Sequence, residues 1–258
     1  MEVFLNPDAW IALLTLTFLE IILGIDNIIF ISIVTGKLPE EERKKATRLG
    51  LFLAMFMRIA LLFGITVLIA MKAPWFSFDF GWFSAEITGQ AMILLFGGLF
   101  LIYKSTKEIG EKVDNRGEEE KSLKTSAKKS FSNVIIQILL IDLIFSVDSI
   151  LTAVGMTNGV EGALYIMVTA VVISVGVMML FAVPVGAFVH KNPSIQILGL
   201  AFLILIGFML ITESMHLSNA DLFGQHVGTV PKGYLYFAIS FSLAIEFLNM
   251  KMRKKKTT

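Results

Sequence analysis

The sequence predicts an all-α membrane protein of about seven transmembrane helices, built as two inverted three-helix repeats and one C-terminal helix. Three observations lead to this fold class. Hydrophobic residues make up 55% of the 258 positions, a share that suits a bundle whose exterior is apolar as well as its packed seams. Seven apolar runs have spanning length, and two of them contain the same pattern of acidic residues.

The apolar runs are long enough to cross a bilayer as helices. A span needs about 20 residues at a rise of about 1.5 Å per residue. The runs cover residues 9–35, 48–71, 88–105, 132–155, 162–189, 195–212 and 233–250. The first ten residues lack Lys and Arg and lack the cleavage site of a signal peptide, so the first run is expected to be a retained helix.

The basic residues between the spans predict the orientation of the chain. Alternate loops hold nearly all of them: residues 37–48, residues 104–129, Lys191 and the C-terminal tail. The opposite loops hold only Lys72 and Lys232. Because cytoplasmic loops are enriched in Lys and Arg, we expect the N-terminus outside and the C-terminus in the cytoplasm of a cell inner membrane.

A polar stretch divides the chain into two halves. Residues 107–130 are rich in Lys, Glu and Gly and are expected to form a flexible, charged cytoplasmic linker. The predicted organisation is a first repeat at 1–106, this linker, a second repeat at 131–214, and a seventh helix with a basic tail at 215–258.

The two halves carry similar motifs. Residues 19–28 read LEIILGIDNI and residues 141–150 read IDLIFSVDSI, so that two acids and a following polar residue match at one constant offset. A weaker similarity links residues 98–104 with 207–213. Because the copies start three helices apart, the second half crosses the membrane in the opposite direction. Inverted repeats of this kind are typical of secondary transporters, whose binding site lies between the repeats.

Charged side chains in the middle of the spans require compensation. They are Glu20, Asp26, Arg58, Asp142 and Asp148. Each charge costs about 2.5–3.5 kcal/mol at the bilayer centre, so five lipid-exposed charges would cost on the order of 12–18 kcal/mol. We therefore expect them to face inward and to pair, take up protons or bind a cation. Arg58 could neutralise one acid and is interpreted as a structural counter-ion.

Helical spacing groups these acids into a candidate metal site. Glu20 shares a helix face with Asn27, as Asp142 does with Ser149. Local unwinding at Gly24 would bring Asp26 to the same side and free backbone carbonyls. The predicted metal ligands are Glu20, Asp26, Asn27, Asp142, Asp148 and Ser149. All offer oxygen, which Mg²⁺, Ca²⁺ and Mn²⁺ prefer, and the chain has no cysteine.

These motifs resemble those of the TerC superfamily of membrane proteins. The resemblance rests on Leu19-Glu20 with Asp26-Asn27 and on Asp142 with Ser146-Val147-Asp148-Ser149. Residues 48–50 (RLG) and 97–101 (GGLFL) are also similar to that family. The resemblance implies a short, membrane-only member of a group of inverted-repeat exporters, with manganese efflux as the expected activity.

The expected function is secondary transport of a divalent cation by the intramembrane carboxylates, with Mn²⁺ efflux driven by proton influx. The expected partners are this cation and the lipid bilayer. No enzyme activity or resident cofactor is expected, and a net charge of +1 indicates no nucleic-acid partner. Two alternatives stay open: a membrane scaffold or assembly factor acting through residues 107–130, and an intramembrane aspartyl hydrolase using paired acids.

Overall fold

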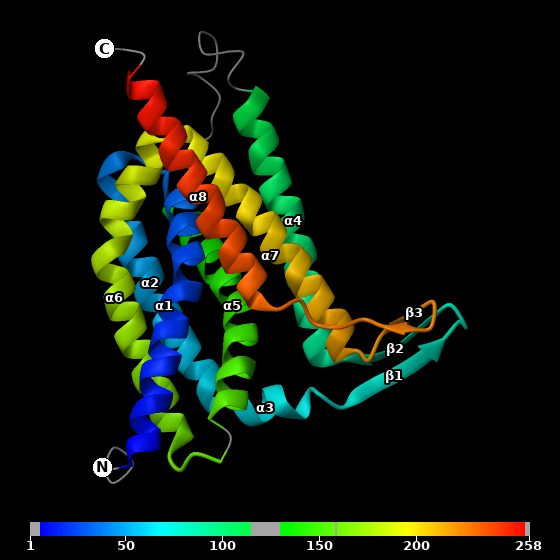
Figure 1. Cartoon of the computed structure of the whole chain (residues 1–258). Helices are drawn as coiled ribbons and strands as arrows, with labels where there is room; N and C mark the ends of the chain where they lie inside the picture. The colour runs from blue at the N-terminus through cyan, green and yellow to red at the C-terminus, as the bar shows by residue number, and fades with distance from the viewer. Residues whose placement is uncertain (1–5, 115–129, 158, 256–258) are drawn as a thin grey trace. The chain divides into compact units, whose positions relative to one another are not determined.

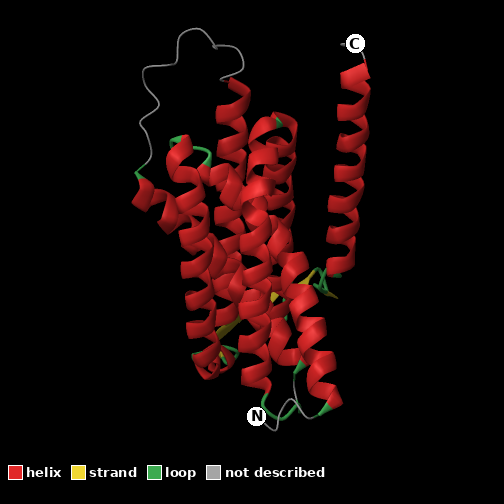
Figure 2. Cartoon of the chain, turned by 90° about the vertical axis from the view of Figure 1, so that its left-hand side faces the viewer, coloured by secondary structure: helices red, strands yellow, loops and turns green. Residues whose placement is uncertain are grey.

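The protein is almost entirely helical (Figures 1 and 2). The computed structural model describes residues 6–114, 130–157 and 159–255, except for the side chains of 25, 26, 65, 66, 68 and 253–255. The prediction for residues 115–129 of the charged linker lies outside the described residues. Residues 107–114, the start of that predicted linker, continue the preceding helix as far as Asp114.

Seven helices of the described chain are long and apolar enough to cross a membrane, as predicted. They are α1 (Pro7–Thr35), α2 (Glu40–Phe63), α4 (Gly89–Asp114), α5 (Phe131–Met156), α6 (Ala163–Lys191), α7 (Pro193–Leu217) and α8 (Lys232–Lys255). A short helix, α3 (Ile65–Ala70), follows α2 after a break at Gly64. Helix α2 begins eight residues before the predicted span, at three glutamates that favour a helix N-terminus.

The helices carry large apolar side chains on their exposed faces. Leu180 of α6 is 74% exposed and Phe237 of α8 is 70% exposed. A water-soluble protein rarely exposes so much contiguous apolar surface, whereas lipid solvates it without penalty. The exposed faces therefore support the assignment of these helices as membrane spans.

The chain forms two compact units, which are described separately. Unit 1 contains α1, α2, α3, α5 and α6, and unit 2 contains α4, α7, α8 and four short strands. Unit 1 thus combines two helices from each predicted repeat. Unit 2 pairs the third helix of each repeat. The repeat boundaries given above stay a prediction.

In unit 1, small residues let the helices approach one another. Helix α2 packs on α5, and a methyl group added at Gly50 would lie 2.9 Å from Ile138 of α5. Helix α1 is continuous through Gly24, so the predicted local unwinding is not observed. The lack of a side chain at Gly24 has a packing explanation, because the sulfur of Met178 from α6 occupies the space that a methyl group would need.

In unit 2, α4 and α7 cross at two glycines that the repeat comparison had matched. A methyl group at Gly98 would lie 2.5 Å from the carbonyl oxygen of Gly207, and one at Gly207 would lie 2.8 Å from that of Gly98. The contact is reciprocal, since Ile211 flanks the first glycine and Ile102 the second. Backbones in direct contact leave no room for any side chain at this crossing.

We expect Gly98→Ala to destabilise unit 2 by about 1–3 kcal/mol, because the added methyl group must push two backbones apart. Gly110→Ala is the matched control in the same helix, since nothing lies within 4 Å of a methyl group at that position. Thermal unfolding of the purified protein in detergent checks this difference. Equal stability of the two variants would contradict the close crossing.

A small antiparallel sheet in unit 2 corrects the all-α prediction. Its strands are β1 (Pro74–Asp79), β2 (Phe83–Thr88), β3 (Asp221–Leu222) and β4 (Gln225–His226), in the order β1-β2-β3-β4. The alternating Phe76, Phe78 and Phe80, followed by a glycine turn, is the sequence signal for the first hairpin. The analysis of apolar runs overlooked it because the hairpin lies between two spans.

Candidate functional site

The candidate site lies inside unit 1, where α1, α2 and α5 each place a charged side chain. Arg58 belongs to the buried face of α2, together with Leu51, Ala54 and Leu62 at helical spacing. Glu20 and Asp142 belong to the buried faces of α1 and α5. Their exposed fractions are 4% for Arg58 and Glu20 and 6% for Asp142, so water contributes little to their solvation.

The guanidinium of Arg58 bridges the two carboxylates. Its Nη1 donates to Oε2 of Glu20 at 2.6 Å, and its Nη2 donates to Oδ1 of Asp142 at 2.6 Å. Its Nε also donates to Oδ2 of Asp142 at 3.1 Å, which makes the contact with Asp142 two-pronged. Charge-assisted bonds of this fork geometry are among the stronger hydrogen bonds in proteins.

Neutral polar groups complete the surroundings of Asp142. Asn27 of α1 donates from Nδ2 to Oδ1 of Asp142 at 3.3 Å. The hydroxyl of Ser146, one turn further along α5, lies 3.2 Å from Oδ2 of Asp142 and 2.6 Å from its backbone carbonyl oxygen. Asp142 is therefore held by groups from three helices.

The charges of this network do not cancel. One guanidinium faces two carboxylates, so the group carries one negative charge when all three are ionised. An uncompensated charge in a low-dielectric interior is costly, and a buried pair that loses one partner is strongly destabilised. A second cation or a proton would balance the group.

The structure brings together three of the six predicted metal ligands. Arg58 joins Glu20 to Asp142, and Asn27 contacts Asp142 directly, whereas the side chain of Asp26 lies outside the described residues. Asp148 is half-buried on α5, and Ser149 donates to the carbonyl oxygen of Ser146 in its own helix. Among the described side chains, no three His, Cys, Asp or Glu residues lie close enough to hold a metal ion. The metal site stays a prediction.

Arg58 contacts more than the single acid expected from the sequence, since its guanidinium forms ion pairs with two acids from different helices. Ser146 was named only as part of the second acidic motif, and its contact with Asp142 was not predicted. The spacing of four residues between Asp142 and Ser146 is the signal for that contact, since such residues share a helix face.

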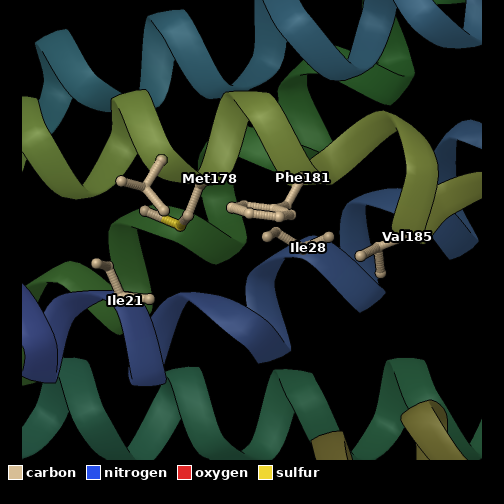
Figure 3. A pocket seen from close by; sticks show the side chains of 6 residues that line it. Ile21, Ile28, Met178, Phe181 and Val185 are labelled. Atoms are coloured by element: carbon tan, nitrogen blue, oxygen red, sulfur yellow. The ribbon is translucent and has the colours of Figure 1, made fainter.

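An apolar cavity of about 290 Å³ lies between α1 and α6 (Figure 3). Its walls are Ile21 and Ile28 of α1 and Val177, Met178, Phe181 and Val185 of α6. None of these side chains offers a ligand to a hard cation. The face of α1 that lines the cavity, with Ile21 and Ile28, differs from the face that carries Glu20 and Asn27.

Seven candidate spans, three of which share a buried ionic network, define a multi-pass membrane protein with polar groups inside its bundle. The chain belongs to the integral membrane protein TerC family, whose family model matches residues 5–258.

Curated relatives agree with this assignment. The chain is 52% identical over 250 residues to the UPF0053 inner membrane protein YgdQ of Escherichia coli, covering 97% of this chain and 96% of YgdQ. It is 46% identical over 249 residues to a UPF0053 protein of Haemophilus influenzae, covering 96% of each. It is 42% identical to YoaE of Escherichia coli, of which it covers 45%. No solved structure matches the chain. The protein is thus a multi-pass inner membrane protein.

Proposed function

We propose that the protein is a secondary transporter that exports a divalent cation through unit 1, with Mn²⁺ as the first candidate cargo. The observation that carries the proposal is the pair of buried carboxylates from α1 and α5 that share a single guanidinium. Carboxylate and amide oxygens suit a hard cation. Ionisable groups inside spans that face a bundle interior commonly mark an ion pathway.

Arg58 is proposed to stand in for the transported cation. Its guanidinium offsets one of the two carboxylate charges while no metal is bound and holds α1, α2 and α5 together. A divalent ion that reaches Glu20 and Asp142 displaces these contacts and takes over their charge. Asp26 and Asp148, at matching positions of the two motifs, are proposed to complete the oxygen ligands.

Two packing features support an inverted repeat that works by alternating access. Glu20 and Asp142 hold equal places in the two motifs and meet at the same residue, and Gly98 and Gly207 make a reciprocal contact. In such a repeat the pair α2 and α5 corresponds to the pair α6 and α1. The first pair is closely packed at Gly50, whereas the second packs at Gly24 against Met178 and leaves an apolar cavity beside that contact. That difference is expected when one side of a transporter is closed.

Export is proposed to run from the cytoplasm, the side on which the basic loops and the C-terminus are expected, to the outside. An inside-negative potential opposes the exit of a divalent cation by about 4.6 kcal/mol per 100 mV. Proton influx is the proposed driving force, with the excess carboxylates as proton carriers. Metal flux in proteoliposomes should therefore follow an imposed pH gradient. Flux that ignores the gradient would exclude this coupling.

We expect expression of the wild-type protein to lower cellular Mn content in cells that lack their own Mn exporters. Asp26→Asn and Asp148→Asn should fail to lower it, because each removes a carboxylate charge from one motif. Metal analysis of washed cells measures the effect, and the amount of protein in the membrane fraction is the control. Unchanged Mn content with the wild-type protein would contradict Mn²⁺ as the cargo.

A further inference from the structure

The sheet of unit 2 forms a surface that the proposed transport does not use. The strands leave the ends of α4 and α7 and run across the direction of these helices (Figure 1). Strand β2 ends at Thr88, one residue before α4 begins, and β3 begins four residues after the end of α7. If α4 and α7 span the membrane, the sheet lies where the bilayer meets water.

The strand register gives this sheet one apolar and one polar face. Residues paired across strands lie on the same face, and neighbours along a strand alternate between faces. Phe76 pairs with Ile87, Phe78 with Ala85, and Phe83 with Leu222. These six residues therefore share one face, with Gln225 at its edge. The other face holds Ser77, Asp79, Ser84, Glu86, Asp221 and His226.

Part of the apolar face and the tips of the hairpins are open to the surroundings: Phe76 and Leu222 are exposed on that face, whereas Ala85 is buried. Phe76 is 58% exposed on that face, and Phe80 and Trp82 in the β1–β2 turn are 67% and 56% exposed. The ring of Phe78 lies between two others, with its centroid 5.4 Å from that of Phe80 and 5.5 Å from that of Phe83. Exposed aromatic side chains at the ends of spans are typical of the membrane interface.

The turn between β3 and β4 adds an independent observation. Phe223 has a φ of +52°, a left-handed conformation that a bulky residue rarely adopts, and Gly224 follows at +77°. Asn, Asp or Gly would fit such a turn with less strain. Phe223 is nevertheless 76% exposed, and its ring lies 6.0 Å from that of Trp82. The turn geometry requires the positive φ, and the choice of Phe223 where Asn, Asp or Gly would fit places an exposed aromatic ring at the tip of the hairpin.

Hydrogen bonds attach the sheet firmly to the ends of α4 and α7. The backbone N–H of Glu86 donates to the carbonyl oxygen of Ser218 at 2.7 Å, and Asn219 donates to the Glu86 carboxylate at 2.9 Å. At the start of α4, the backbone N–H of Ala91 donates to the hydroxyl of Thr88 at 3.1 Å. The sheet is therefore held at the level where these helices end.

We propose that this sheet is an interfacial membrane anchor, which lies on the bilayer with its apolar face and aromatic tips among the lipid headgroups and upper acyl chains. The acidic residues of the opposite face stay in water. Amphipathic secondary structure lying in the plane of the interface gains from both environments.

Paired single-tryptophan variants test this proposal. In a chain whose three tryptophans are replaced by phenylalanine, Phe76→Trp places the probe on the apolar face and Ser77→Trp places it on the polar face. Each full-length variant is reconstituted in phosphatidylcholine nanodiscs, which leave both membrane sides open to solutes. Fluorescence is quenched by lipid brominated near the carboxyl end of its acyl chains, or by aqueous iodide.

We expect the probe at position 76 to be quenched several-fold more by the brominated lipid than the probe at 77, and several-fold less by iodide. If both positions are quenched by iodide alone, the sheet stands in water and the proposal is wrong. If position 76 is protected from iodide but not quenched by brominated lipid, protein covers the face, and the proposal is equally wrong. Leu222→Trp and Asp221→Trp, which the register places on the apolar and the polar face of β3, give the same comparison if the variants at 76 and 77 do not fold.

Discussion

Asp142→Asn is expected to abolish metal efflux while leaving the protein folded. The substitution removes one of two carboxylates, and Arg58 stays paired with Glu20 at 2.6 Å, so no buried charge is left without a partner. The network loses the excess negative charge that would attract a cation. We expect efflux to fall by about 10- to 100-fold or more, since even residues that only support a metal ligand have effects of this size. Cellular Mn content and flux in proteoliposomes measure it.

Asp79→Asn is the matched control for Asp142→Asn. Asp79 is exposed on the sheet of unit 2, and its Oδ1 accepts a hydrogen bond from the backbone N–H of Gly81 at 2.7 Å. An asparagine keeps that acceptor, so the control changes the same charge without disturbing structure. Glu20→Gln should behave as Asp142→Asn does, since the two acids are equivalent in the proposed repeat. Normal efflux by both Glu20→Gln and Asp142→Asn would remove these carboxylates from the pathway.

The sequence predicted the spans well because lipid imposes a strong requirement. Helices that cross a bilayer must be long and apolar, and that property is local, so runs such as 132–155 can be recognised without knowing what they pack against. Their ends were less predictable. Helix α4 extends through polar residues to Asp114, where hydropathy gives no signal but helix propensity continues the element.

The ionic network was predictable in part. The cost of burying charge indicated that Glu20, Asp142 and Arg58 face inward, and helical spacing placed Asn27 on the same face as Glu20. Spacing within one helix cannot tell which helices become neighbours. Arg58 pairs with acids of both α1 and α5 because α2 packs against both helices, and the sequence of α2 alone does not reveal this packing.

The small sheet could be predicted only in part. Its first hairpin has a local signal in alternating phenylalanines, but its second hairpin comes from the α7–α8 connection. Ser84 pairs with Asp221, more than 130 residues later in the chain. Pairing across such a distance depends on the packing of α4 against α7, which brings the two connections together. The two-faced character of the sheet therefore becomes visible only from the register.

Arg58→Gln, unlike Asp142→Asn, is expected to destabilise the protein strongly. It removes the guanidinium and leaves Glu20 and Asp142 buried, 4% and 6% exposed, with no cation between them. Breaking a buried ion pair in this way costs about 3–5 kcal/mol. The thermal unfolding temperature in detergent should fall well below that of the wild-type protein. Arg58→Lys should fall between them, because a lysine keeps the charge but cannot form the two-pronged contact.

Mn²⁺ should restore much of the stability that Arg58→Gln loses. If Arg58 stands in for the cargo, its removal leaves the two carboxylates available to the metal, and a bound ligand stabilises the folded state in proportion to the logarithm of its concentration. The unfolding temperature of Arg58→Gln should rise with added Mn²⁺ more steeply than that of the wild-type protein, in which the guanidinium competes. In the triple variant that also carries Glu20→Gln and Asp142→Asn, the response should disappear. If Mn²⁺ raises the unfolding temperatures of the single and triple variants equally, the metal binds elsewhere and the ion pair is purely structural.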